Sequence, residues 1–465
     1  MTPASSFAGK SVALFGLGGS GIATALALKM GGAEVVCWDD GQASRNKAAA
    51  QGLMLVDLAS AYWSRFSTLI LSPGVPLTHP EPHWVVCRAQ SAGVAIIGDI
   101  EIFFRERAVL ALASPVVAIT GTNGKSTTTA LIAHLLRAAG RDVQMGGNIG
   151  TNILDLAPPS KARVHVIEIS TFQIDLTPSL RPSIAVMLNL TPDHLDRHGS
   201  MEAYAAIKER LVSAADRAVC SVDDSWSKAM ADRRAATGKP LVRFSTGRLA
   251  SGITARAGRI ARMEGGEEYD IANLAGITAL RGVHNAQNVA AATAVALEFD
   301  ITPELIQQAL KSYASLPHRM EPIGKQGKTL FINDSKATNA DSTRGALAGG
   351  ECIFWILGGK EKAGGIEALR PLFGAVAKAY LIGHATETFA ATLQSSVPFA
   401  RCGTLDVAVA QAAADAQASA FSSPIVLLSP ACASYDQYKS FEHRGAHFRD
   451  CVTALSGFTP SDGDP

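Results

Sequence analysis

A chain of 465 residues is too long for one ordinary core, so its length predicts two to four domains and favours three. Hydrophobic residues make up 47% of the chain and charged residues 18%, a composition that supports packed cores and excludes a disordered chain. The net charge of +1 provides no overall field for nucleic acid or anionic lipid, so an anionic ligand must be bound by a local site.

The seven cysteines are scattered and form no CxxC pair, which favours free thiols in a reducing compartment over disulfides or a zinc site. The N-terminal stretch MTPASSFAGK lacks the apolar core of a secretory signal. No run approaches the roughly 18 apolar residues of a membrane span. We therefore expect a cytoplasmic protein that neither inserts into a membrane nor binds nucleic acid.

Short apolar runs alternate with longer helical patterns along nearly the whole chain, as in SVALF, TLILS, VHVIEI, CIFWIL and PIVLLS. Runs that are continuously apolar, rather than alternating with polar residues, indicate strands covered on both faces of a sheet. The sequence therefore predicts an α/β protein with mostly parallel sheets.

The pattern breaks at two places. A helical segment ends between Glu106 and Pro115, and proline and glycine interrupt the chain from Ser315 to Gly327. These breaks predict three domains, at residues 1–112, 113–316 and 317–465. Residues 252–270 predict a small antiparallel excursion within the middle domain.

The first glycine cradle follows the strand SVALF. It is a GxGxxG turn formed by Gly16, Gly18 and Gly21, and a helix and a second strand ending at Asp39 come after it. Small residues at such a turn let backbone N–H groups approach a diphosphate at the helix N-terminus. The turn therefore predicts a dinucleotide or nucleotide-sugar diphosphate site, with Asp39 accepting a hydrogen bond from ribose or base; a turn that only packs strand on helix is the alternative.

Ser72 follows the strand TLILS, in the stretch LSPGVP. It lies at a strand's carboxyl end, the edge of an open α/β sheet where ligands bind. An ordinary Ser-Pro-Gly turn explains this stretch equally well.

The second cradle is TGTNGKS, from Thr120 to Ser126, between the strand PVVAIT and a helical pattern. It departs from the Walker loop because Ile119 stands where that loop has its first glycine. The pattern still predicts backbone amides and Lys125 around the β- and γ-phosphates of a nucleotide, with the Ser126 hydroxyl on Mg²⁺. The alternative is a capped helix start with an incidental lysine.

Polar residues follow the next two predicted strands. Glu168 ends the run VHVIEI, at the edge where Mg²⁺ would need a carboxylate. The loop LNLTPDHLDRHGS brings four more polar residues together, namely Asp193, His194, Asp196 and His198. Taken singly, each would form loop hydrogen bonds, but their common origin at strand ends beside the second cradle favours a ligand site.

Lys208 lies on a predicted helix beside an apolar stripe that contains Tyr204 and Leu211. A helical lysine beside such a stripe is usually solvated, so composition alone predicts an exposed side chain.

Eight motifs occur in order over nearly the whole chain: TGTNGKST, GGNIG, EISTFQ, NLTPDHLDRH, the helix that carries Lys208, HNAQN, LPHRME and NDSKATN. Together they make the chain resemble the Mur ligase family. The C-terminal stretch SPACASYDQYKSFEHRG is similar to the signature of the family members that add D-glutamate.

The resemblance implies a Rossmann-like N-terminal domain that binds a UDP moiety, a central P-loop-type ATPase domain, and a Rossmann-like C-terminal domain that brings the amino acid. It implies an ATP-dependent, ADP-forming amide-bond ligase of peptidoglycan precursor synthesis, acting as a monomer on UDP-N-acetylmuramoyl-L-alanine and D-glutamate through an acyl phosphate. The C-terminal domain would close over that intermediate. One cradle would then hold the nucleotide sugar and the other the ATP that activates it.

Four alternatives remain from the sequence: a sibling ligase adding L-alanine to UDP-N-acetylmuramate, a ligase adding glutamate to a folate, an NAD-dependent oxidoreductase, and a non-catalytic ATP-binding switch. Residue types do not separate D- from L-glutamate, because chirality is read by atomic placement.

The resemblance also assigns residues to the two cradles. The UDP substrate would contact Gly18, Gly19, Ser20, Asp39, Ser72 and Asn148. ATP would contact Gly121, Thr122, Asn123, Gly124, Lys125, Ser126, Thr127, Asn288, Arg319 and Asp334. Two Mg²⁺ ions are implied, one at Ser126 and Glu168 and the other at His194 and Lys208, with Lys208 as an N-carbamate; the implied catalytic residues are Lys125, His194 and Lys208.

The incoming glutamate would be surrounded by Lys336, Thr338, Lys362, Ser434 and Phe441. Cations and hydroxyl donors suit its two carboxylates. The stretch LGGKEKAGG is a loose version of the family's lysine loop, so Lys360 is the alternative to Lys362. Gly19 also departs from the family pattern, which has a larger residue there.

Overall fold

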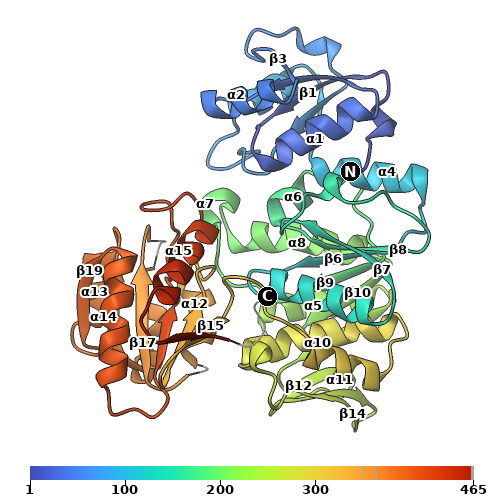
Figure 1. Cartoon of the computed structure of the whole chain (residues 1–465). Helices are drawn as coiled ribbons and strands as arrows, with labels where there is room; N and C mark the ends of the chain where they lie inside the picture. Colours follow the sequence, from blue (N-terminus) through green and yellow to red (C-terminus); the bar gives the residue numbers. More distant parts are fainter. Residues whose placement is uncertain (349, 362–363, 462–465) are drawn as a thin grey trace. The chain divides into compact units, whose positions relative to one another are not determined.

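The computed structural model describes residues 1–348, 350–361 and 364–461, which form three sheets with helices packed on them (Figure 1). Two compact units are present. The first contains Met1–Asn273 with Gln287–Lys311, and the second contains Leu274–Ala286 with Ser312–Pro465. The predicted α/β class with mostly parallel sheets is confirmed.

The N-terminal sheet has the strand order β3-β2-β1-β4-β5, and all its neighbours are parallel. Its strands are β1 (Ser11–Phe15), β2 (Glu34–Trp38), β3 (Met54–Leu55), β4 (Thr68–Leu71) and β5 (Ala95–Ile97). Its helices are η1 (Ser5–Phe7), α1 (Gly19–Met30), α2 (Gln42–Ala50), η2 (Trp63–Arg65), α3 (Trp84–Ser91) and α4 (Asp99–Leu110). The order reverses between β1 and β4, so a ligand crevice is expected at their carboxyl ends.

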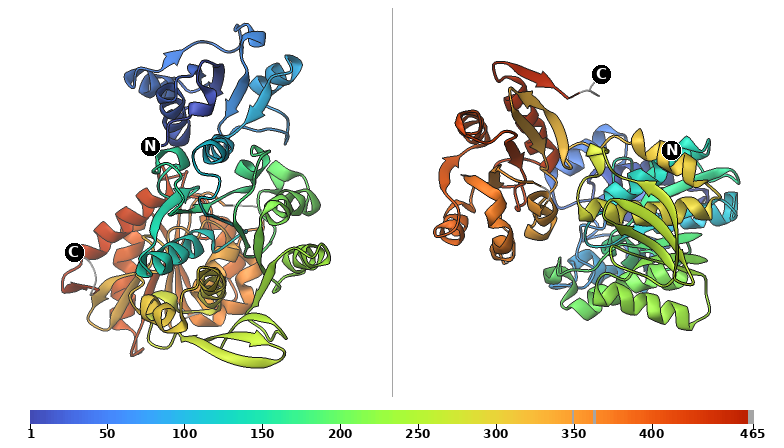
Figure 2. Two further views of the ribbon diagram at one scale, coloured as in Figure 1. Left: turned by 90° about the vertical axis from the view of Figure 1, so that its right-hand side faces the viewer. Right: turned by 90° about the horizontal axis from the view of Figure 1, so that it is seen from below.

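The central sheet has the order β14-β13-β12-β11-β10-β9-β6-β8-β7. Its strands are β6 (Val116–Thr120), β7 (Asp142–Gly147), β8 (Arg163–Glu168), β9 (Ile184–Met187), β10 (Arg217–Ser221), β11 (Leu241–Ser245), β12 (Gly252–Arg256), β13 (Arg259–Glu264) and β14 (Glu267–Asn273). The strands from β7 to β12 are parallel, whereas β12, β13 and β14 pair antiparallel, in yellow-green in Figure 2. The predicted antiparallel excursion is therefore confirmed.

Helices of the central region alternate with its strands. Those of the first unit are α5 (Lys125–Ala138), η3 (Ile153–Asp155), α6 (Thr171–Asp175), α7 (Leu195–His198), α8 (Met201–Ala214), α9 (Ser225–Ala236), α10 (Val283–Glu298, from Gln287 on) and α11 (Pro303–Lys311). The short helix η4 (Thr278–Leu280) belongs to the second unit.

The first two sheets share one hydrophobic core. Phe103 on α4 and Leu14 on β1 belong to the same buried cluster as Ile167 on β8. Glu101 on α4 also accepts hydrogen bonds from the backbone N–H and the hydroxyl of Ser179, both at 2.8 Å. The predicted limit between residues 112 and 113 falls between α4 and β6, inside the first compact unit.

The second unit contains the sheet β19-β18-β17-β20-β16-β15-β21. Its strands are β15 (Glu321–Gln326), β16 (Thr329–Asn333), β17 (Ile353–Gly358), β18 (Val376–Ile382), β19 (Phe399–Gly403), β20 (Ile425–Leu428) and β21 (Phe458–Pro460). Its other helices are α12 (Ala340–Ala348), η5 (Glu367–Ala375), α13 (Thr386–Leu393), α14 (Leu405–Ala418) and α15 (Phe441–Thr453). The order β19-β18-β17-β20 repeats the order β3-β2-β1-β4, and both sheets are Rossmann-like.

Strand β17 shows why its sequence, IFWILG, is continuously apolar. Trp355 and Leu357 pack into the cluster with α13, whereas Phe354 and Ile356 pack into the cluster with α14 on the other face. Because both faces of the strand are buried, the five positions before Gly358 all carry apolar side chains.

None of the helices formed by the described residues is both long enough and apolar enough to span a membrane.

Candidate functional site

The glycines of the first cradle divide into two pairs. A Cβ at Gly16, where φ is +98°, would lie 2.4 Å from Ser72 Cβ, and one at Gly21 would lie 1.8 Å from Gly16 O. A Cβ at Gly18 or Gly19 would meet nothing within 4 Å. The first pair is therefore required for packing, whereas the second pair leaves the start of α1 open to a ligand.

The other predicted residues of the first cradle lie beside these glycines. Asp39 Oδ2 accepts a hydrogen bond from Leu17 N at 2.6 Å, and Asp39 Oδ1 accepts one from Gly41 N at 2.7 Å. Ser72 follows β4, its backbone N–H donates to Phe15 O at 3.0 Å, and its side chain faces Gly16. Asp39 thus shapes the glycine turn, and Ser72 stands at the crevice between β1 and β4.

A matched pair of glycine substitutions separates packing from binding. We expect Gly21→Ala to destabilise the fold by about 2 kcal/mol or more, because its Cβ cannot fit beside a backbone carbonyl. We expect Gly18→Ala to leave the unfolding midpoint unchanged and to weaken UDP binding, because its methyl group enters open space. Thermal unfolding and UDP calorimetry test both expectations; equal loss of stability in the two variants would contradict them.

The second cradle joins β6 to α5. Gly121 and Gly124 have φ of +153° and +81°, and a Cβ at Gly124 would lie 2.3 Å from Asn288 Oδ1. Thr128 Oγ1 donates to the same oxygen at 3.1 Å. The predicted ATP residue Asn288 is therefore brought to this loop. Ile119 lies inside the buried strand β6, which explains why no glycine occurs there.

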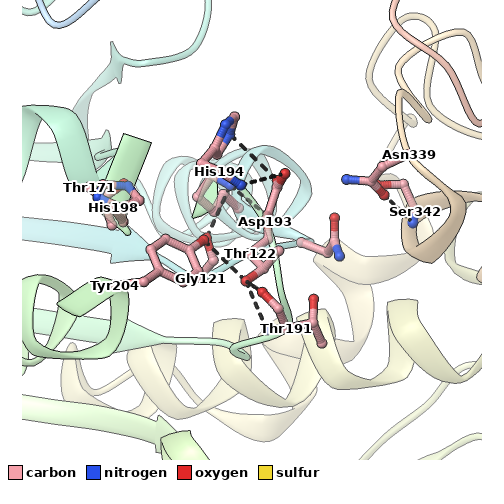
Figure 3. Close-up of polar contacts among 12 residues, drawn as sticks. Gly121, Thr122, Thr171, Thr191, Asp193, His194, His198, Tyr204, Asn339 and Ser342 are labelled. Carbon is pink, nitrogen blue, oxygen red and sulfur yellow. Dashed lines mark hydrogen bonds and ion pairs between the residues drawn. The ribbon is translucent and has the colours of Figure 1, made fainter. Parts of the chain in front are cut away.

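Residues of the loop after β9, of α8 and of α5 contact the rest of this loop. Thr122 Oγ1 contacts Thr191 O at 3.1 Å and the Tyr204 hydroxyl at 3.2 Å (Figure 3). Lys125 Nζ donates to Gly121 O at 3.1 Å and to Thr122 O at 2.7 Å. Helix α5 begins after Gly124, which makes no side-chain cap. An uncapped helix N-terminus behind a glycine loop favours an anion.

A hydroxyl, a carboxylate and an amide meet beside this cradle. The Ser126 hydroxyl donates to Glu168 Oε2, and Asn148 Nδ2 donates to Glu168 Oε1 at 2.8 Å. No group of three His, Cys, Asp or Glu side chains suited to a metal ion occurs in the part of the chain that the structure describes. Mg²⁺ typically takes one or two carboxylates together with substrate phosphates and water, and Ser126 with Glu168 fits that pattern. Asn148, expected at the muramoyl group, lies on the same carboxylate.

Lys208 is only 1% exposed, so the expectation of a solvated side chain is wrong. Its Nζ donates to Thr120 Oγ1 at 3.2 Å and to Gly121 O at 3.0 Å. Burial, and then the like charge of Lys125, lowers the pKa of Lys208 well below its usual range. The helical pattern alone did not reveal that this face of α8 lies over the end of β6.

The loop that precedes α7 separates its two histidines. His194 has φ of +54°, and its Nε2 lies 3.5 Å from Asp193 Oδ2. His198 is stacked between the rings of Phe172 and Tyr204, both at 5.1 Å. Its Nε2 hydrogen-bonds to a hydroxyl, Thr171 Oγ1, at 2.9 Å; Figure 3 labels both residues.

Electrostatics relate these groups to one another. Burial, followed by the charges of His194 and Lys208, lowers the pKa of His198 to about 4. His198 is thus a packed, neutral histidine. His194 and Lys208, the pair expected at the second Mg²⁺, both lie close enough to act on it.

In the second unit, several of the predicted glutamate residues come together. Lys336 Nζ lies 3.8 Å from the centre of the Phe441 ring, and Ser434 is buried. Thr338 is half-buried in the same loop as Lys336. Lys362 lies outside the described residues. The alternative, Lys360, pairs through its backbone with Ala433 at 2.9 and 3.0 Å.

Arg444, which the sequence analysis missed, connects the loops that carry these residues. Its Nε donates to Ser335 Oγ at 3.0 Å, and its Nη2 donates to Ser335 O at 2.8 Å and to Cys432 O at 3.1 Å. Burial lowers its pKa to about 10. Arg444 shares the buried face of α15 with Phe448 and Val452, and a charged residue in that apolar stripe is the signal that could have identified it.

Arg319 and Asp334, both expected at ATP, also lie near each other in this unit. Asp334 Oδ1 accepts from Met320 N at 3.2 Å, and Oδ2 accepts from Ser429 Oγ at 2.8 Å. Burial raises the pKa of Asp334 to about 7, against the lowering effect of those hydrogen bonds and of Arg319.

The raised pKa of Asp334 predicts a pH effect on stability. Its usual pKa is 3.8, so between about pH 4 and about pH 7 the folded chain holds a proton that the unfolded chain releases. Stability from this group is therefore lost as the pH rises through that window. We expect Asp334→Asn to remove this loss. The free energy of unfolding of the variant, relative to that of the wild type, should then rise by up to about 4 kcal/mol as the pH increases from about 4 to about 7. Urea unfolding across the range tests this; a constant difference between the two proteins would contradict it.

Comparisons with known proteins agree with this geometry. Residues 119–296 match the family model described as the Mur ligase middle domain. The chain is 56% identical over 464 residues to the UDP-N-acetylmuramoylalanine–D-glutamate ligase of Nitrobacter hamburgensis. This match covers 99% of this chain and 100% of the relative. The protein of the same name from Rhodopseudomonas palustris strain HaA2 is also 56% identical, with the same coverage.

Solved structures share the fold. The UDP-N-acetylmuramate-alanine ligase MurC from Thermotoga maritima matches with a TM-score of 0.60 at 18% identity, over 96% of this chain and 99% of the other. A pseudomurein peptide ligase type C from Methanothermus fervidus matches with a TM-score of 0.56 at 17% identity and the same coverage. Since the sequence relatives match along almost their entire length, the chain belongs to the Mur ligase family.

Proposed function

We propose that this protein is an ATP-dependent ligase that joins the L-alanyl carboxylate of UDP-N-acetylmuramoyl-L-alanine to the amine of D-glutamate in peptidoglycan precursor synthesis. The observation that carries this proposal is the 56% identity, over 99% of the chain, to ligases named for that reaction. The two cradles in the first unit support it, because a nucleotide sugar and ATP each need a phosphate site. The protein acts in the cytoplasm as a monomer.

The first cradle holds the nucleotide sugar. The open start of α1 at Gly18, Gly19 and Ser20 receives the diphosphate, because its amides and the helix dipole favour negative charge. Asp39 and Ser72 line the same crevice. Asn148 contacts the muramoyl part from its place beside Glu168.

The second cradle activates the substrate carboxylate. A carboxylate oxygen attacks the γ-phosphorus of ATP, the bond to the β–γ bridging oxygen breaks, and an acyl phosphate and ADP result. Lys125 and the loop amides from Gly121 to Thr127 hold the phosphates in line. Asn288, Arg319 and Asp334 contribute the remaining ATP contacts.

Ser126 and Glu168 would hold one Mg²⁺, and His194 and an N-carbamate on Lys208 would hold a second. When bound, these ions screen the repulsion between the carboxylate and the triphosphate. The burial of Lys208 beside the second cradle supports its role, because burial lowers its pKa and so favours the neutral amine that can take up CO2; the resulting carbamate would offer an oxygen ligand in place of a cation.

The second unit brings glutamate. The amine of glutamate attacks the carbonyl carbon of the acyl phosphate and forms a tetrahedral intermediate. Loss of a proton from the nitrogen and of inorganic phosphate from the carbon then leaves the amide. Lys336, Thr338, Lys362, Ser434 and Phe441 bind the amino acid. Two carboxylates require this supply of cations and hydroxyls, and Arg444 keeps the loops in place.

The decisive experiment follows ADP release with UDP-N-acetylmuramoyl-L-alanine and each glutamate enantiomer in turn. We expect turnover with D-glutamate. We expect no turnover with L-glutamate, and none with UDP-N-acetylmuramate and L-alanine. Turnover with the last pair would instead assign the sibling alanine-adding activity. Borohydride trapping or positional isotope exchange without glutamate should reveal the acyl phosphate, and the absence of both signals would overturn that intermediate.

A further inference from the structure

The loop after β4 and the helix α7 belong to different sheets of the first unit, yet they touch at two points. Arg197 on α7 donates from Nη1 to Gly74 O at 3.2 Å. At the second point, a Cβ at Gly199 would lie 3.0 Å from the ring of His79. The loop that carries Ser72 therefore rests on the segment that begins with His194.

Arg197 is itself held in place by its neighbours. Its guanidinium lies 4.7 Å from the centre of the Phe172 ring, in a cation–π contact. Phe172 packs edge-on against His194 at 5.4 Å, and the Arg197 N–H donates to His194 O at 2.9 Å. One arginine thus contacts the His194 turn through its backbone and the Ser72–Gly74 loop through its side chain.

The backbone at His194 needs such support. Its φ of +54° is a left-handed conformation that costs a residue other than glycine about 1 kcal/mol or more, and it persists only where the surroundings enforce it. On the other side of the unit, the shared core around Phe103 already joins the two sheets. The contact made by Arg197 connects the same sheets at the edge where their strands end.

We propose that Arg197 is a positioning residue that sets the distance between the nucleotide-sugar cradle and the phosphoryl-transfer site. This inference rests on the proposed ligase function. A carboxylate and a γ-phosphate react only when their atoms are about 3–3.5 Å apart and aligned, so a small displacement of one cradle lowers the rate steeply. Arg197 acts on this alignment without touching either substrate.

The test compares Arg197→Gln, Arg197→Lys and the control Arg181→Gln in the full-length protein. Arg181 also makes a side-chain contact to a distant segment, with Asp216 Oδ1 at 3.1 Å, but it lies before the amino end of β9, at the end of that strand opposite the cradle. We expect Arg197→Gln to lower kcat/KM for UDP-N-acetylmuramoyl-L-alanine about tenfold, as the loss of one charge-assisted hydrogen bond would do. Arg197→Lys should restore most of it, and Arg181→Gln should match the wild type.

Binding of a non-hydrolysable ATP analogue and the unfolding midpoint separate positioning from a structural role. Analogue binding should be unchanged in Arg197→Gln, and the unfolding midpoint should fall only slightly, because the backbone bond from Arg197 N to His194 O remains. Wild-type kinetics in Arg197→Gln would overturn the inference, and so would a loss of analogue binding or of stability that matches the loss of activity. A wild-type protein that forms no product would instead overturn the proposed function, which distinguishes the two failures.

Discussion

Replacing Lys125 by methionine is expected to lower kcat by about a thousandfold, the scale seen when a preorganised group that stabilises developing charge is removed. Lys125 is the ammonium at the start of α5, and its Nζ lies against the carbonyls of Gly121 and Thr122. Because the charge on the transferred phosphoryl group spreads in the transition state, the loss should appear in kcat more than in the KM for ATP.

The fold should tolerate Lys125→Met. The charge of Lys125 lowers the pKa of the buried Lys208, so its removal relieves a like-charge contact rather than breaking an ion pair with it. Lys228→Met is a suitable control, since Lys228 pairs with Asp232 at 2.8 Å on the exposed face of α9. Steady-state ADP release and thermal unfolding measure both variants. A Lys125→Met enzyme within about tenfold of wild-type kcat would contradict the assignment of this loop to the triphosphate.

The features that sequence predicts well here are those that local chemistry determines. Gly16, Gly21, Gly121 and Gly124 are recognisable because only glycine tolerates their close approaches or their positive φ. The strand IFWILG is recognisable because both of its faces are buried. The glycines and the apolar run carry these signals in the local sequence, although the neighbours that enforce them are distant, as Ser72 is from Gly16 and Asn288 is from Gly124. The predicted class and the antiparallel excursion followed from such local signals.

The features that sequence misses depend on contacts between distant segments. Arg444 binds Ser335 and Cys432, and neither partner can be identified from the sequence around α15. Likewise, His194 and His198 occur four residues apart in one polar loop, yet one starts a helix and the other is stacked between two rings. Composition predicted a solvated Lys208. The prediction failed because tertiary packing, which local sequence does not show, decides the orientation of α8 over β6.

Lys208→Ala is expected to lower kcat by about a thousandfold or more, and a short carboxylate such as formate or acetate should restore part of the lost activity. Lys208 is buried with its Nζ 3.2 Å from Thr120 Oγ1 and 3.0 Å from Gly121 O. Truncation frees space beside the second cradle, where a small carboxylate could supply the oxygen ligand that the proposed carbamate would give to Mg²⁺. Activity should therefore rise with carboxylate concentration and saturate.

Two controls make this prediction specific. The same carboxylates should not restore Lys125→Met, since that variant lacks a cation rather than an oxygen ligand. Wild-type activity should fall when dissolved CO2 is removed and return when bicarbonate is added, whereas Lys208→Ala with acetate should be indifferent to both.

The truncated protein should still fold, because burial lowers the pKa of Lys208 and thus makes its charged form unfavourable in the native state. A folded Lys208→Ala enzyme that no carboxylate restores, beside a wild type insensitive to CO2, would remove the carbamate and leave Lys208 as a structural lysine of the glycine loop.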